Sequence, residues 1–197
     1  MVMSGSSYYQ KLYEIAAAIN STLTREVVLQ TIVEKVTQAM DAKGCSIILL
    51  SPDKKELLHT ITYGLSDWYL RKGPLSPDKS ISEAMQGKVV AILNAAEDDR
   101  VQYQELAKLE GIVSILSVPM TLRAEIIGVI RVYTAKMYPF TLEDLYFMGA
   151  VGNLAAIALE NARFVESVKK GNEALREELL EWRKAMGDWP PRLAHRR

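Results

Sequence analysis

Two apolar stretches joined by a short polar break, SILSVPMTLRAEIIGVIRVY at Ser114–Tyr133, constrain the fold more than any other segment. Successive side chains of a β-strand point to opposite faces, so Ile115 and Leu116 lie on different faces, as do Val129 and Ile130. None of these faces is distinctly polar. A strand that is apolar on both faces belongs in the middle of a sheet covered on both sides. The segment therefore predicts a central hairpin between two covering layers.

Helical and strand patterns surround this hairpin. Apolar residues recur at helical spacing from Tyr8 to Asn20, and a second helix is expected after Thr24 as its N-cap. The segments CSIILL, ELLHTITYG and KVVAIL read as further strands bounded by turn residues. Thr141 as N-cap with Asp144 at N3 predicts the start of the last helix.

The last helix is expected to run far beyond what the sheet can cover. Steps of three and four residues along it give Val151, Leu154, Ala158, Asn161, Val165, Val168, Asn172, Leu175, Leu179, Trp182 and Met186. Most of these residues are apolar, which matches the heptad seam of a coiled coil. The sequence thus predicts a homodimer whose interface contains Leu12, Ile15, Ile19, Leu154, Ala158, Val165, Val168, Asn172, Leu175, Leu179 and Trp182. The alternative is a helix that folds back on the first helix of its own chain.

Composition limits the partners and the compartment. Lys and Arg together number 24, as do Asp and Glu, so no net charge draws the chain to nucleic acid or anionic membranes. No apolar run reaches the roughly 18 residues of a membrane span, and the first residues lack a signal-peptide pattern. A single cysteine fits a reducing compartment. We expect a cytoplasmic protein that binds neither nucleic acid nor membrane.

Groups for catalysis are sparse, so we expect no catalytic residue, no metal site and no cofactor. His59 stands alone in a predicted strand and His195 in a basic tail, whereas a metal ion needs several ligands. Cys45 opens an apolar strand and reads as a buried, unreactive thiol. Phosphate-binding loops and triad spacings are also missing.

The ordered segments GKVVAILNAAEDDR, LEGIVSIL, SVPMTLRAEIIGVIRVY and FTLEDLYFMGAVGNLAAIALENARF resemble the GAF domain, a small-molecule-binding module of bacterial sensors, phytochromes and cyclic-nucleotide phosphodiesterases. The match spans about Leu12 to Val165. The resemblance implies an α+β, PAS-related fold: a central antiparallel sheet of about six strands, terminal helices on one face, and loops and a pocket on the other. The expected organisation is a disordered 1–7, a GAF domain at 8–165, a signalling coiled-coil helix at 166–187 and a flexible 188–197.

Known GAF subtypes make specific demands on this sequence. Members that reduce free methionine sulfoxide use several cysteines, and bilin-binding members use one in a pocket loop, whereas Cys45 is alone and on a strand. Cyclic-nucleotide-binding members have an Asn-Lys pair, then Phe, then Asp-Glu. Here Lys136, Phe140 and Asp144 fit that pattern, but Ala135 and Leu145 replace Asn and Glu. Cyclic-nucleotide binding therefore remains an alternative, and haem, for which only His59 is available, ranks lower.

A pocket over the sheet would be walled by Tyr63, Trp68, Ile92, Asn94, Asp98, Ile112, Ser114 and Leu116, with Arg100 or Arg131 able to meet an anion. Each residue also has a structural interpretation. The aromatic rings can fill space under a loop, and Asp98 can cap a following helix. Arg131 on an apolar face needs a carboxylate partner or a ligand, because burying an unpaired charge is costly.

The leading hypothesis is a non-catalytic sensor module that binds a small molecule over its sheet and signals through a helical dimer. In similar proteins such a helix leads to a kinase, a cyclase or a transcription regulator. The first alternative is a GAF fold without ligand, which serves for dimerisation or protein docking. An enzyme with an unrecognised site ranks last.

Overall fold

The computed structural model describes residues 5–20, 24–51, 57–73, 75 and 81–186. In chain order its elements are α1 (Gly5–Asn20), α2 (Arg25–Ala39), β1 (Gly44–Leu50), β2 (Leu57–Tyr63), α3 (Asp67–Leu70), α4 (Ser82–Met85), β3 (Val90–Ile92), α5 (Gln104–Glu110), β4 (Ser114–Leu122), β5 (Glu125–Thr134) and α6 (Leu142–Met186). The first helix thus begins at Gly5, three residues before the helix expected from the sequence. The predicted tail at 188–197 lies outside the described residues.

The strands form one antiparallel sheet in the order β2-β1-β5-β4-β3. The predicted hairpin is β4–β5, and both of its strands are interior strands, as its two apolar faces require. The described residues contain five strands, where the resemblance implied about six. After β2 the chain turns at Gly64 and forms α3, whose N-cap Ser66 accepts a hydrogen bond from the Tyr69 N–H.

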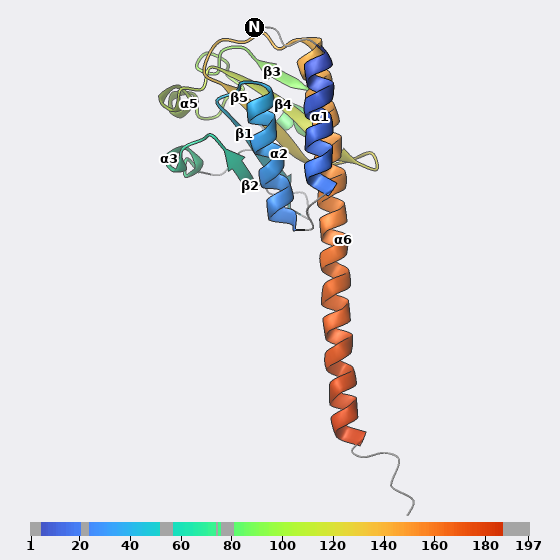
Figure 1. The fold of residues 1–197 in the computed structure, drawn as a ribbon. Helices are drawn as coiled ribbons and strands as arrows, with labels where there is room; N and C mark the ends of the chain where they lie inside the picture. The colour runs from blue at the N-terminus through green and yellow to red at the C-terminus, as the bar shows by residue number, and fades with distance from the viewer. Residues whose placement is uncertain (1–4, 21–23, 52–56, 74, 76–80, 187–197) are drawn as a thin grey trace, which may run out of the picture.

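Each face of the sheet has its own core. The helix-side core packs α1, α2 and the first half of α6 against residues such as Ile47, Leu116 and Ile130. The loop-side core packs α3, α4, α5 and their loops against residues such as Ile48 and Ile115. Figure 1 shows the long helices on one side of the sheet and α3 and α5 on the other. The predicted α+β arrangement of helices and loops on opposite faces is confirmed.

A capping box starts α6, as predicted. The Thr141 N–H donates to Asp144 Oδ2 at 2.7 Å, and the Asp144 N–H donates to Thr141 Oγ1 at 3.2 Å. Two N–H groups at the helix start are thereby satisfied. The other carboxylate oxygen of Asp144 accepts a hydrogen bond from the Tyr8 hydroxyl of α1. The helix start is thus tied to the first helix of the chain.

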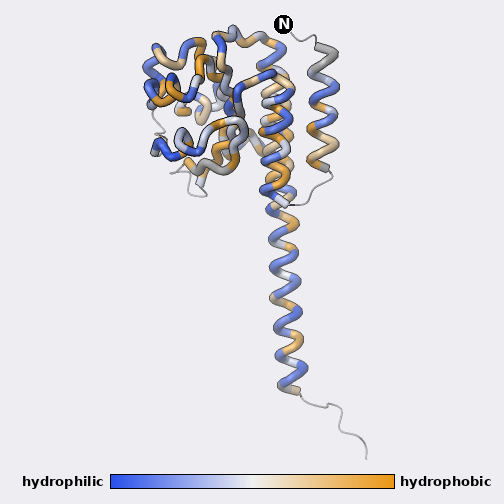
Figure 2. The backbone as a smooth tube through the Cα atoms, turned by 60° about the vertical axis from the view of Figure 1, so that its left-hand side comes forward, coloured by the Kyte–Doolittle hydropathy of each residue, from blue (hydrophilic) through white to orange (hydrophobic). Residues whose placement is uncertain are grey.

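The second half of α6 projects beyond the domain. The helix has 45 residues, so it is about 68 Å long at 1.5 Å per residue. Figure 2 shows apolar positions recurring along the projecting part among hydrophilic ones. An 18-residue window within Leu142–Lys184 has a mean hydropathy of 1.3, high enough for a membrane span by length and composition alone. Half of that window is buried inside the fold, as in the core helix of a globular domain.

Two backbone features shape the hairpin. Arg123 and Ala124 form its two-residue turn with φ values of 50° and 67°, the left-handed pair of a type I′ turn. Gly128 of β5 lies so close to β1 that an added Cβ would be 2.5 Å from the Ile48 carbonyl oxygen. The absence of a side chain at Gly128 therefore allows β5 to pair closely with β1.

Candidate functional site

The loop side of the sheet holds a small cavity beside a buried arginine. Its volume is about 20 Å³, enough for about one water molecule. It is lined by Tyr69, Lys72, Leu75, Val101, Gln102, Tyr103, Ile115 and Arg131. Arg131 is the one predicted pocket residue in this lining, and its side chain is almost completely buried.

Several other predicted pocket residues lie elsewhere. Ile92 and Ile112 belong to the loop-side core but do not line the cavity. Leu116 lies in the helix-side core, and Ser114 shares its strand face and donates to the Leu93 carbonyl at 2.6 Å. The assignment of Ser114 and Leu116 to the pocket wall is therefore corrected. Both faces of β4 are apolar, so the alternation of its side chains does not show which face meets the loops.

The predicted aromatic wall is also absent from the cavity. Tyr63 pairs with Cys45 across β1–β2, and the Cys45 side chain lies in the helix-side core. Trp68 is 47% exposed and meets the Tyr69 ring edge-on, with centroids 6.0 Å apart. Tyr69 itself is buried and lines the cavity. The sequence analysis correctly expected an aromatic residue from this segment in the pocket wall, but it named Trp68, whereas the adjacent Tyr69 lines the cavity.

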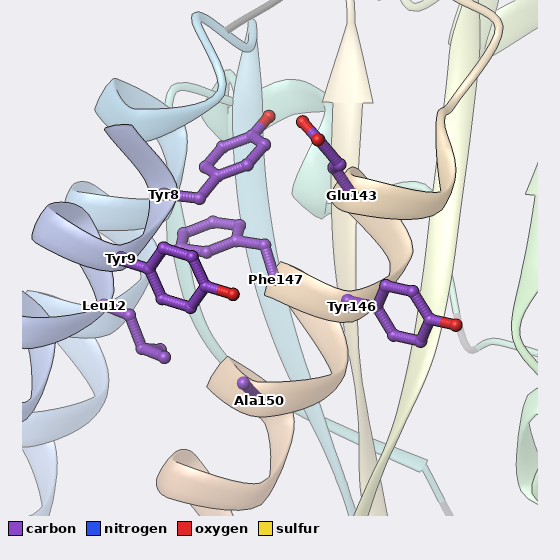
Figure 3. Close-up of a pocket in the computed structure, with 7 residues that line it drawn as sticks. All are labelled: Tyr8, Tyr9, Leu12, Glu143, Tyr146, Phe147 and Ala150. Carbon is purple, nitrogen blue, oxygen red and sulfur yellow. The ribbon is translucent and has the colours of Figure 1, made fainter. Parts of the chain in front are cut away.

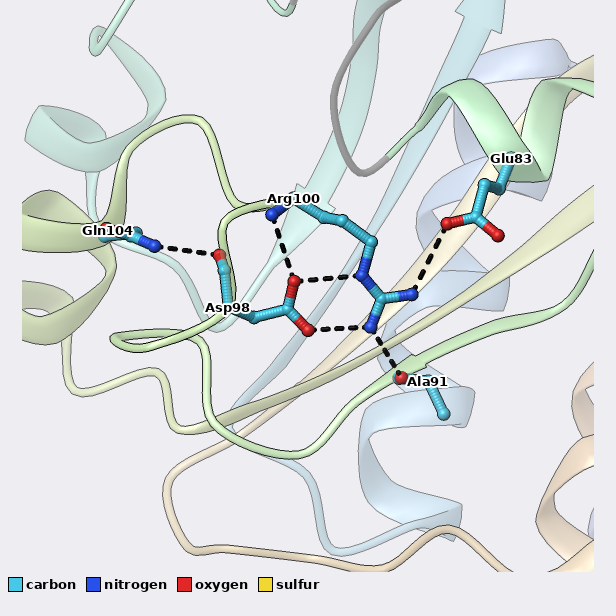
Figure 4. A network of polar contacts seen from close by, with 5 residues as sticks. All are labelled: Glu83, Ala91, Asp98, Arg100 and Gln104. Carbon is cyan, nitrogen blue, oxygen red and sulfur yellow. Dashed lines mark hydrogen bonds and ion pairs between the residues drawn. The ribbon is translucent and has the colours of Figure 1, made fainter.

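Arg100 and Asp98 form a local ion pair on the surface (Figure 4). The guanidinium binds both carboxylate oxygens, with Nε–Oδ1 at 2.9 Å and Nη2–Oδ2 at 2.7 Å, and Nη1 lies 3.4 Å from Glu83 Oε1. These hydrogen bonds hold the pKa of Asp98 below its usual value. Asn94 caps the same loop, since its Oδ1 accepts from the Ala96 N–H at 3.2 Å. Arg100, Asp98 and Asn94 are thus engaged in building the loop.

Lys72 also lines the cavity, but it was not predicted from the sequence as a pocket residue. Its Nζ lies 3.7 Å from the centroid of the Tyr69 ring and donates to the Tyr69 carbonyl at 3.3 Å. Burial, and then the positive charge of Arg131, lower the pKa of Lys72 to about 8, while Glu110 acts in the opposite direction. Its segment mixes prolines, aromatics and charges without periodicity, so no sequence signal could have placed it.

Polar residues surround Arg131 on its own face of the sheet. Its register partners are Ser46 on β1 and Ser117 on β4, and both serines are fully buried. The Ser46 hydroxyl is 2.9 Å from the Tyr133 hydroxyl. The Arg131 guanidinium carbon lies 5.6 Å from the centroid of the Tyr133 ring. This face therefore carries a polar strip in the middle of an apolar core.

Glu110 joins α5 to the start of α3. Its carboxylate accepts hydrogen bonds from the Ser66 N–H at 3.1 Å and from the Ser66 hydroxyl, and it lies 3.5 Å from Lys43 Nζ. Burial raises the pKa of Glu110, but the bonds from Ser66 and the charge of Lys43 outweigh it, and the pKa is lowered overall. The acidic group whose charge acts on Lys72 is thus already held by other partners.

A second hollow lies between α1 and α6 on the helix side (Figure 3). It has a volume of about 190 Å³ and is lined by Tyr8, Tyr9, Leu12, Glu143, Tyr146, Phe147 and Ala150. The rings of Tyr8 and Phe147 stack with centroids 4.5 Å apart. Tyr9 and Tyr146 are largely exposed at its rim. This groove is an aromatic surface that the fold leaves open.

The predicted dimer residues divide into two groups. Ile15 and Ala158 are buried in the helix-side core, and Leu12 and Ile19 pack against that core, so α1 covers α6 within the same chain. Their assignment to a dimer interface is corrected for Ile15 and Ala158, because heptad spacing cannot tell which helix covers a seam. Leu154 and Val165 are half-buried, and Val168, Asn172, Leu175, Leu179 and Trp182 are exposed.

The residues that matched the cyclic-nucleotide pattern serve the start of α6. Asp144 is buried between Thr141 and Tyr8, and Phe140 packs against the helix-side core. Lys136 is exposed. All three lie apart from the lining of the loop-side cavity.

Catalytic chemistry finds little support in the described ranges. They contain no group of three or more His, Cys, Asp or Glu side chains able to hold a metal ion. Cys45 is fully buried, and burial raises the pKa of its thiol, which keeps it protonated and unreactive. The His59 side chain and all of His195 lie outside the description.

Comparisons with solved structures show a shared fold. The GAF domain of an Acinetobacter phosphoenolpyruvate-protein phosphotransferase is 24% identical with a TM-score of 0.69, covering 83% of this chain and 98% of that one. A domain of a putative two-component sensor histidine kinase from Sinorhizobium meliloti 1021 is 15% identical with a TM-score of 0.61. The match covers 72% of this chain and 94% of that one. Free methionine-R-sulfoxide reductase from Neisseria meningitidis, in complex with its substrate, is 13% identical with a TM-score of 0.70. The match covers 84% of this chain and 95% of that one.

Sequence comparison gives the family. No curated protein matches the chain significantly. The family model described as GAF domain matches residues 22–160, which contain α2, the whole sheet and the buried first half of α6. With the two-sided sheet, the matching solved structures and this coverage, the chain belongs to the GAF domain family.

Proposed function

We propose that this chain is a non-catalytic, cytoplasmic regulatory module that dimerises through α6 and relays the state of its loop-side cavity along that helix. The exposed apolar strip on the projecting half of α6 carries the proposal. Val168, Leu175, Leu179, Trp182 and Met186 are each about half exposed or more. Their spacing of seven, four, three and four residues keeps them on one side of the helix.

A second copy of α6 is the partner that fits this strip best. Apolar residues in heptad spacing pack into holes of a matching helix, and each buried Leu or Val side chain stabilises the pair by about 1.5–3 kcal/mol. Asn172 lies within the strip, where a polar residue selects the register and the number of helices. The aromatic groove between α1 and α6 provides further apolar surface at the same side of the fold.

A short physical path supports coupling between the cavity and the helix. Arg131 faces the cavity, and the preceding residue, Ile130, lies on the other face of the sheet in the helix-side core. Gly152 of α6 lies directly over this point, since an added Cβ would be 3.1 Å from the Pro119 carbonyl oxygen and 3.8 Å from Ile130. A shift of β5 on ligand binding would therefore reach α6 through a single side chain, that of Ile130. Such a ligand acts only if it binds the two arrangements unequally.

The test is the oligomeric state of matched variants of the full chain, measured by sedimentation velocity. Leu175→Lys and Leu179→Lys place a charge in the strip, and Ala174→Lys adds the same charge at an exposed position outside it. We expect a dimer for the wild type and for Ala174→Lys and a monomer for the two leucine variants. A wild type that stays monomeric at all micromolar concentrations contradicts the proposal.

A second candidate is a docking module without ligand. It is favoured by the loop-side core itself, where the cavity has space for about one water molecule. Native mass spectrometry before and after denaturation separates the two candidates. A mass that is lost on denaturation supports a sensor, whereas a bare protein mass supports the docking module. Binding of a cyclic nucleotide is the third candidate, and the same spectra test it.

Methionine sulfoxide reduction is the enzymatic alternative that one structural relative raises. The chain has a single cysteine, which is buried. A buried thiol with a raised pKa is a poor nucleophile, and one cysteine cannot form the intramolecular disulfide that would store the oxidising equivalents. We therefore propose that the chain is not a reductase.

A further inference from the structure

The loop-side cavity brings together two cationic side chains from distant parts of the chain. Lys72 follows α3, and Arg131 lies in the middle of β5. Both line the same cavity, and they are close enough for the charge of Arg131 to act on Lys72. None of the described residues in the lining is Asp or Glu. The wall of this cavity is therefore positive.

The other arginine considered from the sequence is unsuited to hold an anion. The Arg100 guanidinium already binds both oxygens of Asp98 and lies 3.4 Å from Glu83. Arg131 also has contacts within the fold, but a guanidinium carries five N–H donors and can serve several acceptors at once. Arg131 is thus the arginine that has both burial and a cavity.

A buried hydroxyl on the same face gives an independent indication. Ser117 is the register partner of Arg131 on β4, so both side chains point to the loop side. Its exposed fraction is 0%, and its Oγ has no hydrogen-bond partner among the described residues. Buried polar groups are nearly always paired with protein, water or a ligand. Ser117 does not itself line the cavity, so a polar guest would become a partner of this hydroxyl only by reaching past Arg131.

We propose that the loop-side cavity receives the anionic head group of a small molecule, a carboxylate or a phosphate, held between Lys72 and Arg131. The inference rests on the proposed sensor function and names the chemical class of its ligand. Charge-assisted hydrogen bonds from both cations would hold the anion, and the nearby Tyr69 and Tyr103 would exclude water from it. The cavity has space for about one water-sized group, so one oxygen of the head group would enter it and the rest of the molecule would lie outside.

The test is an NMR titration of the isotope-labelled full chain at constant ionic strength. The probes are acetate, inorganic phosphate and acetamide, which has the shape of acetate without its charge. We expect saturable shifts of the Arg131 Nε–Hε and Lys72 side-chain signals with acetate, with phosphate or with both, and none with acetamide. A response to one anion alone identifies the head group as carboxylate or phosphate.

Variants make the test specific. Lys72→Met keeps the chain length and removes the charge, and Lys88→Met removes a charge from an exposed position outside the cavity. We expect about tenfold weaker anion binding for Lys72→Met, since one charge-assisted bond is lost, and no change for Lys88→Met. Equal shifts with acetamide, shifts away from the cavity, no binding, or an unchanged affinity in Lys72→Met would each overturn the inference. An intact dimer in the same samples leaves the dimer proposal standing.

Discussion

The Tyr8 hydroxyl donates a 2.5 Å hydrogen bond to Asp144 Oδ1 across 136 residues of sequence. The same carboxylate closes the capping box of α6 through its other oxygen. Burial raises the pKa of Tyr8, as do the hydrogen bond and the charge of Asp144, so the hydroxyl keeps its proton at all ordinary pH values. One side chain thereby fixes both where α6 begins and how α1 lies against it.

Tyr8→Phe should therefore destabilise the domain. The ring can still stack on Phe147, but a buried oxygen of Asp144 loses its donor. We expect the free energy of unfolding to fall by about 1–3 kcal/mol in urea denaturation. Tyr9→Phe is the control, because Tyr9 is largely exposed and should give a change near zero. Equal effects of the two variants would show that the bond to Asp144 contributes nothing.

Gly128→Ala and Gly149→Ala should change stability in opposite directions. The Cβ added at Gly128 would meet the Ile48 backbone oxygen at 2.5 Å, so β1 and β5 must separate locally. Gly149 lies in α6 with nothing within 4 Å of an added Cβ. We expect Gly128→Ala to cost about 2 kcal/mol or more and Gly149→Ala to stabilise by up to about 1 kcal/mol. Thermal and chemical denaturation measure both, and a stable Gly128→Ala would contradict the strand contact.

Ala124→Gly should stabilise the chain. Ala124 holds a φ of 67° in the hairpin turn, a conformation that costs an L-residue about 1 kcal/mol and a glycine almost nothing. We expect this gain in the folded state to exceed the loss from the greater freedom of glycine in the unfolded chain. Ala124→Val should destabilise, because β-branched residues tolerate positive φ poorly. Chemical denaturation of both variants gives the sign of each change.

Lys72 should make stability depend on pH in the alkaline range. Its pKa is about 8 in the folded chain against 10.5 ordinarily. Below about pH 8 both states are protonated and the full cost of burying the charge applies. Between about pH 8 and 10.5 the unfolded state holds more protons, so the free energy of unfolding rises with pH.

Lys72→Met should remove this rise and be more stable than the wild type at pH 7. The groups facing Lys72 are Tyr69, Arg131 and Glu110, of which Tyr69 opposes the rise near pH 10 because its pKa is raised. Denaturation curves between about pH 7 and 9.5 therefore isolate the lysine. Parallel pH profiles for wild type and variant would contradict the assignment.

Sequence reasoning was most successful where a local rule decides the structure. The capping box of Thr141 and Asp144 depends on two residues three positions apart, so a short sequence motif is enough to predict it. The interior position of β4 and β5 follows from apolar residues on both faces. The assignment of helices and loops to opposite faces came from the GAF resemblance and was also confirmed.

It was wrong where the answer depends on which partner covers a surface. Ile15 of α1 and Ala158 of α6 were predicted to meet a second copy of the chain, yet both are buried in the helix-side core of their own chain. Ser114 and Leu116 were placed in the pocket because alternation alone leaves the two faces of β4 equivalent. Lys72 lies in a segment without periodicity, and only the folded chain brings it to Arg131. Contacts over long sequence separations carried the information that these patterns lack.

The uninterrupted course of α6 from the core to Met186 has a consequence for spacing and phase. A straight helix advances about 1.5 Å and turns about 100° with every residue, so its length sets both the distance and the direction of its far end. Seven residues inserted after Gly171 would lengthen the rod by about 10 Å and turn its end by only about 20°, whereas two residues would turn it by about 160°. The number of residues between Gly171 and Trp182 thus determines both how far the end of α6 lies from the domain and which way it faces.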